Sequence, residues 1–214
     1  MGLFSRKTAT ATTTAAATTS PAPTGAVATL TPGTPDLAHL TGDYTIDTTH
    51  SRIGFTVRHA MVTNVRGEFA DYVGKLHLDG GNPAASTAEL VIQVASIDTG
   101  NEQRDGHLRT GDFFAVETHP EIAFRSTATE QLDAETYRMA GDLTIKGTTR
   151  PVALTLEFTG SAVDPYGVQR LGFEGTTTVD RTDFGLSYNA ALETGGVLIG
   201  EKVKLTFDIS AVRA

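Results

Sequence analysis

The sequence has no cysteine among its 214 residues. Catalysis by a cysteine thiolate and metal sites built on cysteine are therefore excluded. The absence of cysteine also fits a protein of a reducing compartment.

Familiar catalytic motifs are missing as well. The sequence has no Gly-x-Ser-x-Gly elbow and no Gly-x-Gly-x-x-Gly loop, and its six histidines include no pair at the His-x-x-x-His spacing of zinc sites. Residues 195–202 resemble a phosphate-binding loop, but Glu201 stands in the place of its lysine, so we expect a hairpin turn there. The sequence predicts no catalytic residues, no metal site and no cofactor.

Long apolar runs are absent too. No stretch approaches the roughly 20 apolar residues that a membrane-spanning helix requires. Near the start of the chain, Thr interrupts every run of Ala, whereas a secretory signal needs an unbroken apolar stretch behind its positive charges. We therefore expect a cytoplasmic protein without stable membrane insertion.

Positive charge is sparse. The chain has 17 Lys and Arg against 25 Asp and Glu, which gives a net charge of −8. Nucleic acid binding needs clusters of Lys and Arg opposite phosphates, so the composition argues against nucleic acid as a partner. Anionic membrane surfaces should repel so acidic a protein weakly.

The first 42 residues are rich in Thr, Ala and Pro and have almost no bulky apolar residue after Phe4. Such a segment cannot bury enough surface to offset the entropy of its chain. We predict a disordered tail over residues 1–42 and one folded domain over residues 43–214. Removal of residues 1–40 should then leave the melting temperature unchanged.

Beyond the tail, bulky apolar residues alternate with polar ones. A period of two is typical of antiparallel strands that have one face in a core and the other in water. Glycines inside these strands permit the bends of a curling sheet, so we predict an all-β barrel. The strands are expected near residues 43–48, 51–59, 64–78, 87–97, 121–130, 136–146, 150–162, 169–181 and 200–213.

One segment, residues 99–114, breaks this period. Thr99 and Glu102 have the spacing of a capping box, and Gly111 suits the end of a helix. We expect a short helix between two strands, anchored by Leu108 together with Phe113 and Phe114. Such a helix would cover one end of the barrel.

Several motifs stand out as a set along the part of the sequence that is expected to fold. The longest runs from Ser96-Ile97-Asp98-Thr99-Gly100-Asn101 through Arg104-Asp105-x-His107-Leu108-Arg109 and Asp112-Phe113-Phe114 to His119-Pro120-Glu121-Ile122-Ala123-Phe124-Arg125-Ser126. Others are His50-Ser51-x-Ile53-x-Phe55-x-Val57-x-His59, Val65-x-Gly67-x-Phe69, Leu143-Thr144-Ile145-Lys146-Gly147 and Asp180-Arg181-x-Asp183-Phe184-Gly185. Together these motifs resemble those of the YceI-like family, over residues 43–212. The resemblance implies an extended, eight-stranded, lipocalin-like antiparallel barrel. It also implies a homodimer and a bacterial carrier or store of polyisoprenoids.

The interior of such a barrel is either filled by side chains or holds one ligand, and alternation alone does not separate the two cases. If the lumen is open, its apolar residues would contact the isoprenoid chain. The candidates for the lumen are Phe55, Val57, Phe69, Leu76, Leu90, Ile92, Phe124, Leu143, Leu154, Leu156, Phe173, Leu205 and Phe207.

Four basic residues are candidates for a ligand head group. Arg104, His107 and Arg109 on the short helix could bind phosphate oxygens at the barrel mouth. Arg104 could equally hold the helix on the barrel, and Arg181 with Asp183 could hold a loop beside the end of a strand.

These patterns predict non-catalytic binding, storage or transport of an isoprenoid lipid of the polyprenyl phosphate or quinone type. Two alternatives remain open at this stage. The first is a small hydrolase or isomerase that acts on a lipid in the lumen, and the second is a stress or interaction module without a ligand.

Overall fold

A computed structural model describes residues 37–192 and 195–214, which all belong to one compact unit, Pro32–Ala214. The predicted tail therefore lies outside the described residues up to residue 36. The chain forms strands β1 (Gly42–Ile46), β2 (Arg52–His59), β3 (Thr63–Phe69), β4 (Tyr72–Leu78), β5 (Thr87–Gln93), β6 (Ile97–Asp98), β7 (Glu121–Gln131), β8 (Thr136–Ile145), β9 (Thr148–Val163), β10 (Gln169–Asp180) and β11 (Ile199–Arg213). Helix α1 covers Glu102–Arg109, and the 3-10 helices are η1 (Ala38–Leu40), η2 (Pro83–Ala85), η3 (Val94–Ser96) and η4 (Arg181–Phe184).

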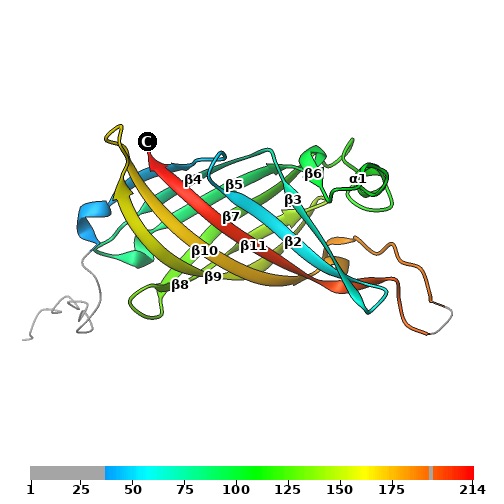
Figure 1. Ribbon diagram of the computed structural model, residues 1–214. Coiled ribbons are helices and arrows are strands. Elements are labelled where there is room, and N and C mark those ends of the chain that lie inside the picture. Colours follow the sequence, from blue (N-terminus) through cyan, green and yellow to red (C-terminus); the bar gives the residue numbers. More distant parts are fainter. Residues whose placement is uncertain (1–36, 193–194) are drawn as a thin grey trace, which may run out of the picture. The chain divides into compact units, whose positions relative to one another are not determined.

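Antiparallel pairing closes the sheet into a barrel. The strands follow the order β1-β4-β5-β7-β8-β9-β10-β11, and β1 pairs with β11 to complete the ring, with Tyr44 opposite Arg213. This confirms the predicted eight-stranded antiparallel barrel with one short helix. In Figure 1, the long strands β8 to β11 cross the barrel obliquely, and α1 lies at the end opposite the C-terminus.

Strands β2, β3 and β6 extend the barrel at the end that carries α1. β11 pairs with β1 near its end and with β2 along the rest of its length, so β1 and β2 act as two parts of one bent strand. In the same way, β4 pairs with β1 and β3 pairs with β2, so β3 and β4 are also two parts of one bent strand. The single strand predicted over residues 64–78 is therefore divided at Ala70 and Asp71.

The interior follows the alternation of the sequence. In β8, Tyr137, Met139, Leu143 and Ile145 are buried at every second position, and Gly141 takes the remaining one. A Cβ atom on Gly141 would lie 2.5 Å from the ring of Phe124. Glycine at this position therefore lets an aromatic ring of β7 lie against the β8 backbone.

Two clusters of buried apolar residues make up the core. The larger one includes Phe113, Phe184 and Leu186 from the segments outside the strands near α1. The smaller one joins η1 to the barrel and consists of the buried residues Leu37, Leu40, Tyr44, Leu78, Leu171 and Ala211.

The folded domain begins earlier than predicted, because Leu37 and Leu40 of the smaller cluster were assigned to the tail. Removal of residues 1–40 would delete both leucines, so it should lower the melting temperature and not leave it unchanged. The Tyr44 hydroxyl donates a hydrogen bond to the Leu40 carbonyl oxygen over 2.6 Å and ties η1 to β1. Burial raises the pKa of Tyr44, so the hydroxyl keeps its proton at neutral pH. Two isolated leucines in a Thr/Pro-rich sequence gave no periodic signal for this contact.

A charged cluster fixes the bend between β1 and β2. Asp47 accepts hydrogen bonds from Arg170 Nη1 over 2.6 Å and from His50 Nδ1 over 2.8 Å, and Arg170 Nε reaches Asp164 over 3.0 Å. The hydrogen bond from Arg170, followed by that from His50, holds the pKa of Asp47 well below its usual range. These contacts connect the bend to the β9–β10 turn.

Helix α1 begins differently from the prediction. Its N-cap is Asn101, whose Oδ1 accepts a hydrogen bond from the Arg104 backbone N–H over 2.9 Å, and not Thr99. Thr99 instead donates through its backbone N–H and its hydroxyl to the buried carboxylate of Asp105. None of the helices in the described ranges is both long enough and apolar enough to cross a membrane.

The packing of η1 gives a stability prediction. Leu40 is 1% exposed, so Leu40→Ala should lower the free energy of unfolding by about 2 to 5 kcal/mol and the melting temperature by about 5 °C or more. The neighbouring exposed residue supplies the control, and His39→Ala should leave both quantities unchanged. Thermal and denaturant unfolding measure the difference, and equal stability of the two variants would show that η1 does not pack as described.

Candidate ligand-binding site

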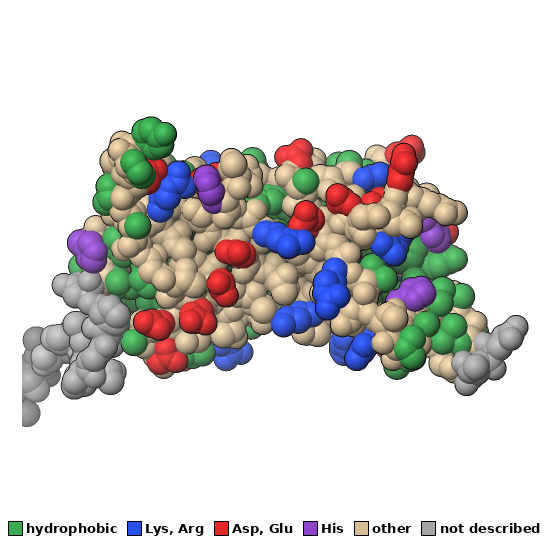
Figure 2. All heavy atoms as spheres, viewed as in Figure 1, with side chains coloured by type: hydrophobic (Ala, Val, Ile, Leu, Met, Phe, Trp, Pro, Cys, Tyr) green, Lys and Arg blue, Asp and Glu red, His purple; other side chains and the backbone are tan. Residues whose placement is uncertain are grey.

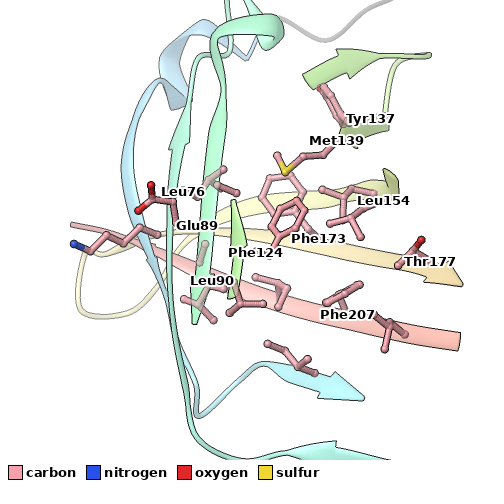
Figure 3. Close-up of a pocket in the computed structure, with 18 of the residues that line it drawn as sticks. Leu76, Glu89, Leu90, Phe124, Tyr137, Met139, Leu154, Phe173, Thr177 and Phe207 are labelled. Atoms are coloured by element: carbon pink, nitrogen blue, oxygen red, sulfur yellow. The ribbon is translucent and has the colours of Figure 1, made fainter. Parts of the chain in front are cut away.

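An apolar cavity lies inside the barrel, and residues of both clusters line it. Side chains from all eight strands of the ring line it, and Leu90, Phe124, Leu154, Phe173 and Phe207 converge on it in Figure 3. The cavity is partly open to solvent. Its lining residues are Leu37, Ile46, Ile53, Gly54, Phe69, Lys75, Leu76, Leu78, Ser86, Ala88, Glu89, Leu90, Ile92, Ile122, Phe124, Thr129, Tyr137, Met139, Leu143, Ile145, Val152, Leu154, Leu156, Phe158, Phe173, Thr177, Leu205, Phe207, Ile209 and Ala211.

All of the residues predicted to face the lumen line this cavity except Phe55 and Val57. Both lie on β2 beyond Ile53, in the part of the strand that continues past the ring. The Phe55 ring packs on Phe69 with 5.7 Å between ring centroids, and Val57 is half-buried nearer the hairpin tip. The alternation of the sequence correctly predicts which side chains of β2 face inward. It does not predict how far along the barrel axis these side chains lie.

The prediction also missed several residues of the wall. Ile122, Val152, Phe158 and Ile209 belong to alternating strands and could have been found by extending the same pattern. Met139 and Tyr137 were harder to find, because Gly141 interrupts the alternation of bulky residues in β8.

Several inward residues of the strands are only half-buried. Leu76, Leu90, Leu156, Phe173 and Phe207 are in this group, and each occupies an inward position of its strand and lines the cavity. A side chain within a barrel stays accessible only where space remains beside it. The middle of the barrel is therefore not filled by its own side chains.

The free space is narrow. The cavity has a volume of about 170 Å³. An engineered cavity of about 150 Å³ lined by Leu, Ile and Phe stays dry and binds benzene. The cavity thus accepts a slender hydrocarbon, and a longer one requires side chains to turn aside.

Few polar groups reach the cavity, and most of these are already bonded. The Thr129 hydroxyl donates to the Ser86 carbonyl oxygen over 2.9 Å, and the Thr177 hydroxyl donates to the Ala153 carbonyl oxygen over 2.8 Å. Tyr137 differs, because its hydroxyl oxygen accepts a long bond of 3.3 Å from Gln131 Nε2 and keeps its own hydrogen for another acceptor. Burial, followed by the charge of Asp133, raises the pKa of Tyr137, so this donor persists at neutral pH.

The charged residues of the lining, Lys75 and Glu89, lie opposite each other on β4 and β5 and are exposed. In Figure 3, Glu89 points to the opposite side of its strand from Leu90. These two charges therefore lie on the outer face, and apolar side chains dominate the interior.

The basic residues of α1, predicted for a head group or for a structural role, do not line the cavity. Arg104 donates from Nε to Thr99 Oγ1 over 2.7 Å and from Nη2 to the Thr99 carbonyl oxygen over 2.8 Å. Arg109 donates to the carbonyl oxygens of Ala95 and Ile97 over 3.0 and 2.9 Å. Both side chains therefore hold α1 to the η3–β6 segment, which is the structural role.

His107 makes contacts with the outer segments near α1. Its Nε2 lies 2.9 Å from Asp112 Oδ2, and its ring meets those of Phe113 and Tyr188 edge-on with centroid distances of 5.1 and 4.9 Å. These contacts join α1 to the segment after η4.

Arg181 is buried and holds the loop that follows η4. Its guanidinium donates to the carbonyl oxygens of Gly200 over 2.9 Å, Tyr188 over 3.0 Å and Ile199 over 3.3 Å, and also to that of Leu186. The sequence suggested Asp183 as its partner, but Asp183 is exposed and makes no ion pair with it in the described structure. Burial lowers the pKa of Arg181, and the carbonyl oxygens satisfy its donors.

Within the described ranges, no group of three or more His, Asp and Glu side chains has the arrangement of a metal site. The segment resembling a phosphate loop begins with Gly195 and Gly196, which have φ of +88° and +92°, and continues into strand β11 from Ile199 onward.

Comparison with known proteins places this barrel in a family. The family model for the YceI-like domain matches residues 44–211. The chain belongs to the YceI-like family. A UPF0312 protein of Ectopseudomonas mendocina is 35% identical over 176 residues, covering 81% of this chain and 89% of that protein. A UPF0312 protein of Staphylococcus epidermidis is 38% identical over 169 residues, covering 78% of this chain and 95% of that protein.

Solved structures share the fold. The YceI protein of Campylobacter jejuni superposes with a TM-score of 0.64 at 28% identity and covers 73% of this chain and 90% of its own. BcnA of Burkholderia cenocepacia has a TM-score of 0.68 at 22% identity, with coverage of 77% and 98%. A polyisoprenoid-binding domain from Saccharophagus degradans has a TM-score of 0.60 at 18% identity, with coverage of 80% and 98%.

The contacts of Arg181 give a second stability prediction. Arg181→Met should leave the buried carbonyl oxygens around it without donors and lower the free energy of unfolding by roughly 3 kcal/mol or more. Arg138→Met is the matched control, because Arg138 is exposed on β8 and should tolerate the change. Denaturant unfolding measures both, and limited proteolysis should show faster cleavage within residues 185–198 of the Arg181 variant. A stable, uncleaved variant would contradict the loop-holding role.

Proposed function

We propose that this protein binds an isoprenoid lipid in the barrel lumen without altering it chemically, as a carrier or a store. The observation that carries the proposal is the apolar cavity inside the barrel, lined by half-buried side chains such as Leu90, Leu156 and Phe207. An accessible apolar wall is a favourable environment for hydrocarbon and a poor one for water.

The strength of binding follows from ligand length. Drug-sized ligands gain about 0.3 kcal/mol per heavy atom, so a chain of about 30 heavy atoms reaches about 9 kcal/mol, which corresponds to a submicromolar Kd. Such a chain exceeds the space now free in the lumen, so leucines of the wall and Met139 must change rotamer to admit it. Met139 is well suited to this because its side chain is unbranched and flexible.

The polar lining favours an uncharged head group. Arg104, Arg109 and Arg181 already donate to oxygen atoms of the protein, and among the described residues no arginine lines the cavity. The Tyr137 hydroxyl offers one hydrogen bond, which suits the carbonyl of a quinone better than the charge of a phosphate. Of the two lipid types expected from the sequence, the quinone type is the better supported.

A domain of the same fold supports the choice of ligand, since the Saccharophagus degradans protein is a polyisoprenoid-binding domain. The sequence motifs of nucleophilic and nucleotide-dependent enzymes are missing from this chain. Binding without turnover is therefore the simplest use of the cavity.

Filling the lumen tests the proposal. Leu90→Trp and Leu156→Trp place extra volume into the cavity from β5 and β9, and both should lower the affinity for a prenyl quinone at least tenfold while the barrel stays folded. Val73→Trp is the control, because Val73 is 68% exposed on the outer face of β4 and should leave affinity unchanged. Binding is measured on delipidated protein by titration with a quinone of intermediate chain length, and folding by circular dichroism.

The ligand itself is identified by native mass spectrometry and organic extraction. We expect an intact prenyl lipid to be recovered from the wild-type protein and lost from the two lumen variants. Equal affinity of the lumen variants and Val73→Trp would refute the proposal, and conversion of the added lipid to a product would identify an enzyme instead.

A further inference from the structure

The β2–β3 hairpin carries an exposed apolar tip beside a group of basic side chains. Met61 and Val62 at the tip are 59% and 74% exposed. The backbone N–H of Ala60 donates to the Leu198 carbonyl oxygen over 2.7 Å, so the residues around Val197 lie beside the tip. We call this surface the hairpin patch, and it consists of Met61, Val62, Val197, Arg58, Arg66 and Lys204.

The turn at the tip is unusual for its residues. The loop between the paired residues His59 and Thr63 has three residues. The first two, Ala60 and Met61, have φ of +48° and +61°, a left-handed conformation that Asn and Gly adopt most easily. Ala60 and Met61 therefore hold a backbone conformation that is unfavourable for their residue types, and Met61 and Val62 expose apolar surface. Such a departure from local preference is often associated with a functional surface.

The basic residues of the patch are unpaired and adjacent. Thr56 on β2 lies opposite Arg66 on β3 and opposite Lys204 on β11, and Arg58 follows two residues nearer the tip on the same face. All three basic side chains are exposed, and none of them makes a hydrogen bond or ion pair with residues 37–192 or 195–214. In Figure 2, basic side chains gather near the middle of the face and toward the hairpin end, where hydrophobic side chains are also exposed.

The opposite end of the barrel also exposes apolar residues, but the charged residues beside them are acidic. Tyr166 is 90% exposed on the β9–β10 turn beside Asp164, and Leu132 is exposed on the β7–β8 hairpin beside Asp133 and Glu135. Residues 130–136 and 163–169 contain no Lys or Arg. The two ends thus differ in charge although both expose apolar side chains.

We propose that the hairpin patch docks the protein reversibly on an anionic phospholipid bilayer. The apolar tip enters the interface of the bilayer while Arg58, Arg66 and Lys204 contact the phosphates, the combination that anchors peripheral proteins. The net charge of −8 does not prevent this, because acidic groups more than about 8 Å from the patch are largely screened at physiological salt. Docking does not depend on the lumen ligand, but it would bring a lipid-binding barrel to the place where lipids reside.

A second copy of the chain fits the patch less well. Two-fold pairing would set the same surface against itself and bring three unpaired cations of each copy together. A layer of phosphates neutralises these cations instead.

The test is co-sedimentation of the full chain with vesicles. Wild-type protein should bind vesicles that contain phosphatidylglycerol and phosphatidylcholine, bind less at high salt, and bind phosphatidylcholine vesicles weakly. Arg58→Glu combined with Arg66→Glu should lower the partition coefficient by about fivefold or more for each basic side chain lost. Arg138→Glu on β8 is the charge control and should bind as the wild type does.

A second variant separates docking from folding. Ala60→Asn combined with Met61→Gly installs the residues that the turn prefers and removes its apolar tip, so the melting temperature should stay equal or rise while vesicle binding falls. Tyr166→Gly at the other end is its control and should keep full binding. Undiminished binding in both patch variants would overturn the proposal, as would a change in oligomeric mass with no vesicle binding by the wild type. Leu156→Trp should bind vesicles normally, so loss of the lumen ligand and loss of docking are distinguished.

Discussion

The antiparallel pairing of β1 with β11 closes the barrel, and the lumen depends on that closure. Once the sheet is closed into a ring, every second side chain of each strand points into one interior volume. The sizes of these side chains then decide whether that volume is filled or hollow. Two clusters of buried side chains form the core, whereas Leu76, Leu90 and Phe207 remain half-buried around the cavity. The outer segments support this arrangement, because Arg181 holds the loop after η4 through backbone carbonyl oxygens.

Much of the fold could be predicted from the sequence, because a period of two in hydrophobicity has one simple structural meaning. The strands, their antiparallel order and most residues of the cavity wall follow from it, as Leu90 and Phe124 illustrate. The errors of this prediction also have physical causes. Phe55 and Val57 lie on the inward face of β2 but beyond the eight-stranded ring. The position of a residue along the barrel axis depends on how neighbouring strands are staggered, and alternation does not reveal that.

The remaining differences concern interactions that carry no periodic signal. Leu37 and Leu40 are isolated apolar residues whose burial depends on the space that the smaller cluster leaves for them. Arg104 and Arg181 bind oxygen atoms of the backbone, which every residue has, so the sequence could not name their partners. The hairpin patch likewise depends on strand register, since Arg58, Arg66 and Lys204 come from three strands.

The central claim is that the middle of the barrel is empty, apolar and accessible. Xenon enters dry apolar cavities of this size, so diffraction from crystals held under xenon pressure tests the claim most directly. We expect strong xenon peaks inside the barrel in contact with Leu90 or Leu156, in protein from which lipid has been extracted. A lumen without xenon, in which these side chains touch across the barrel, would contradict the account.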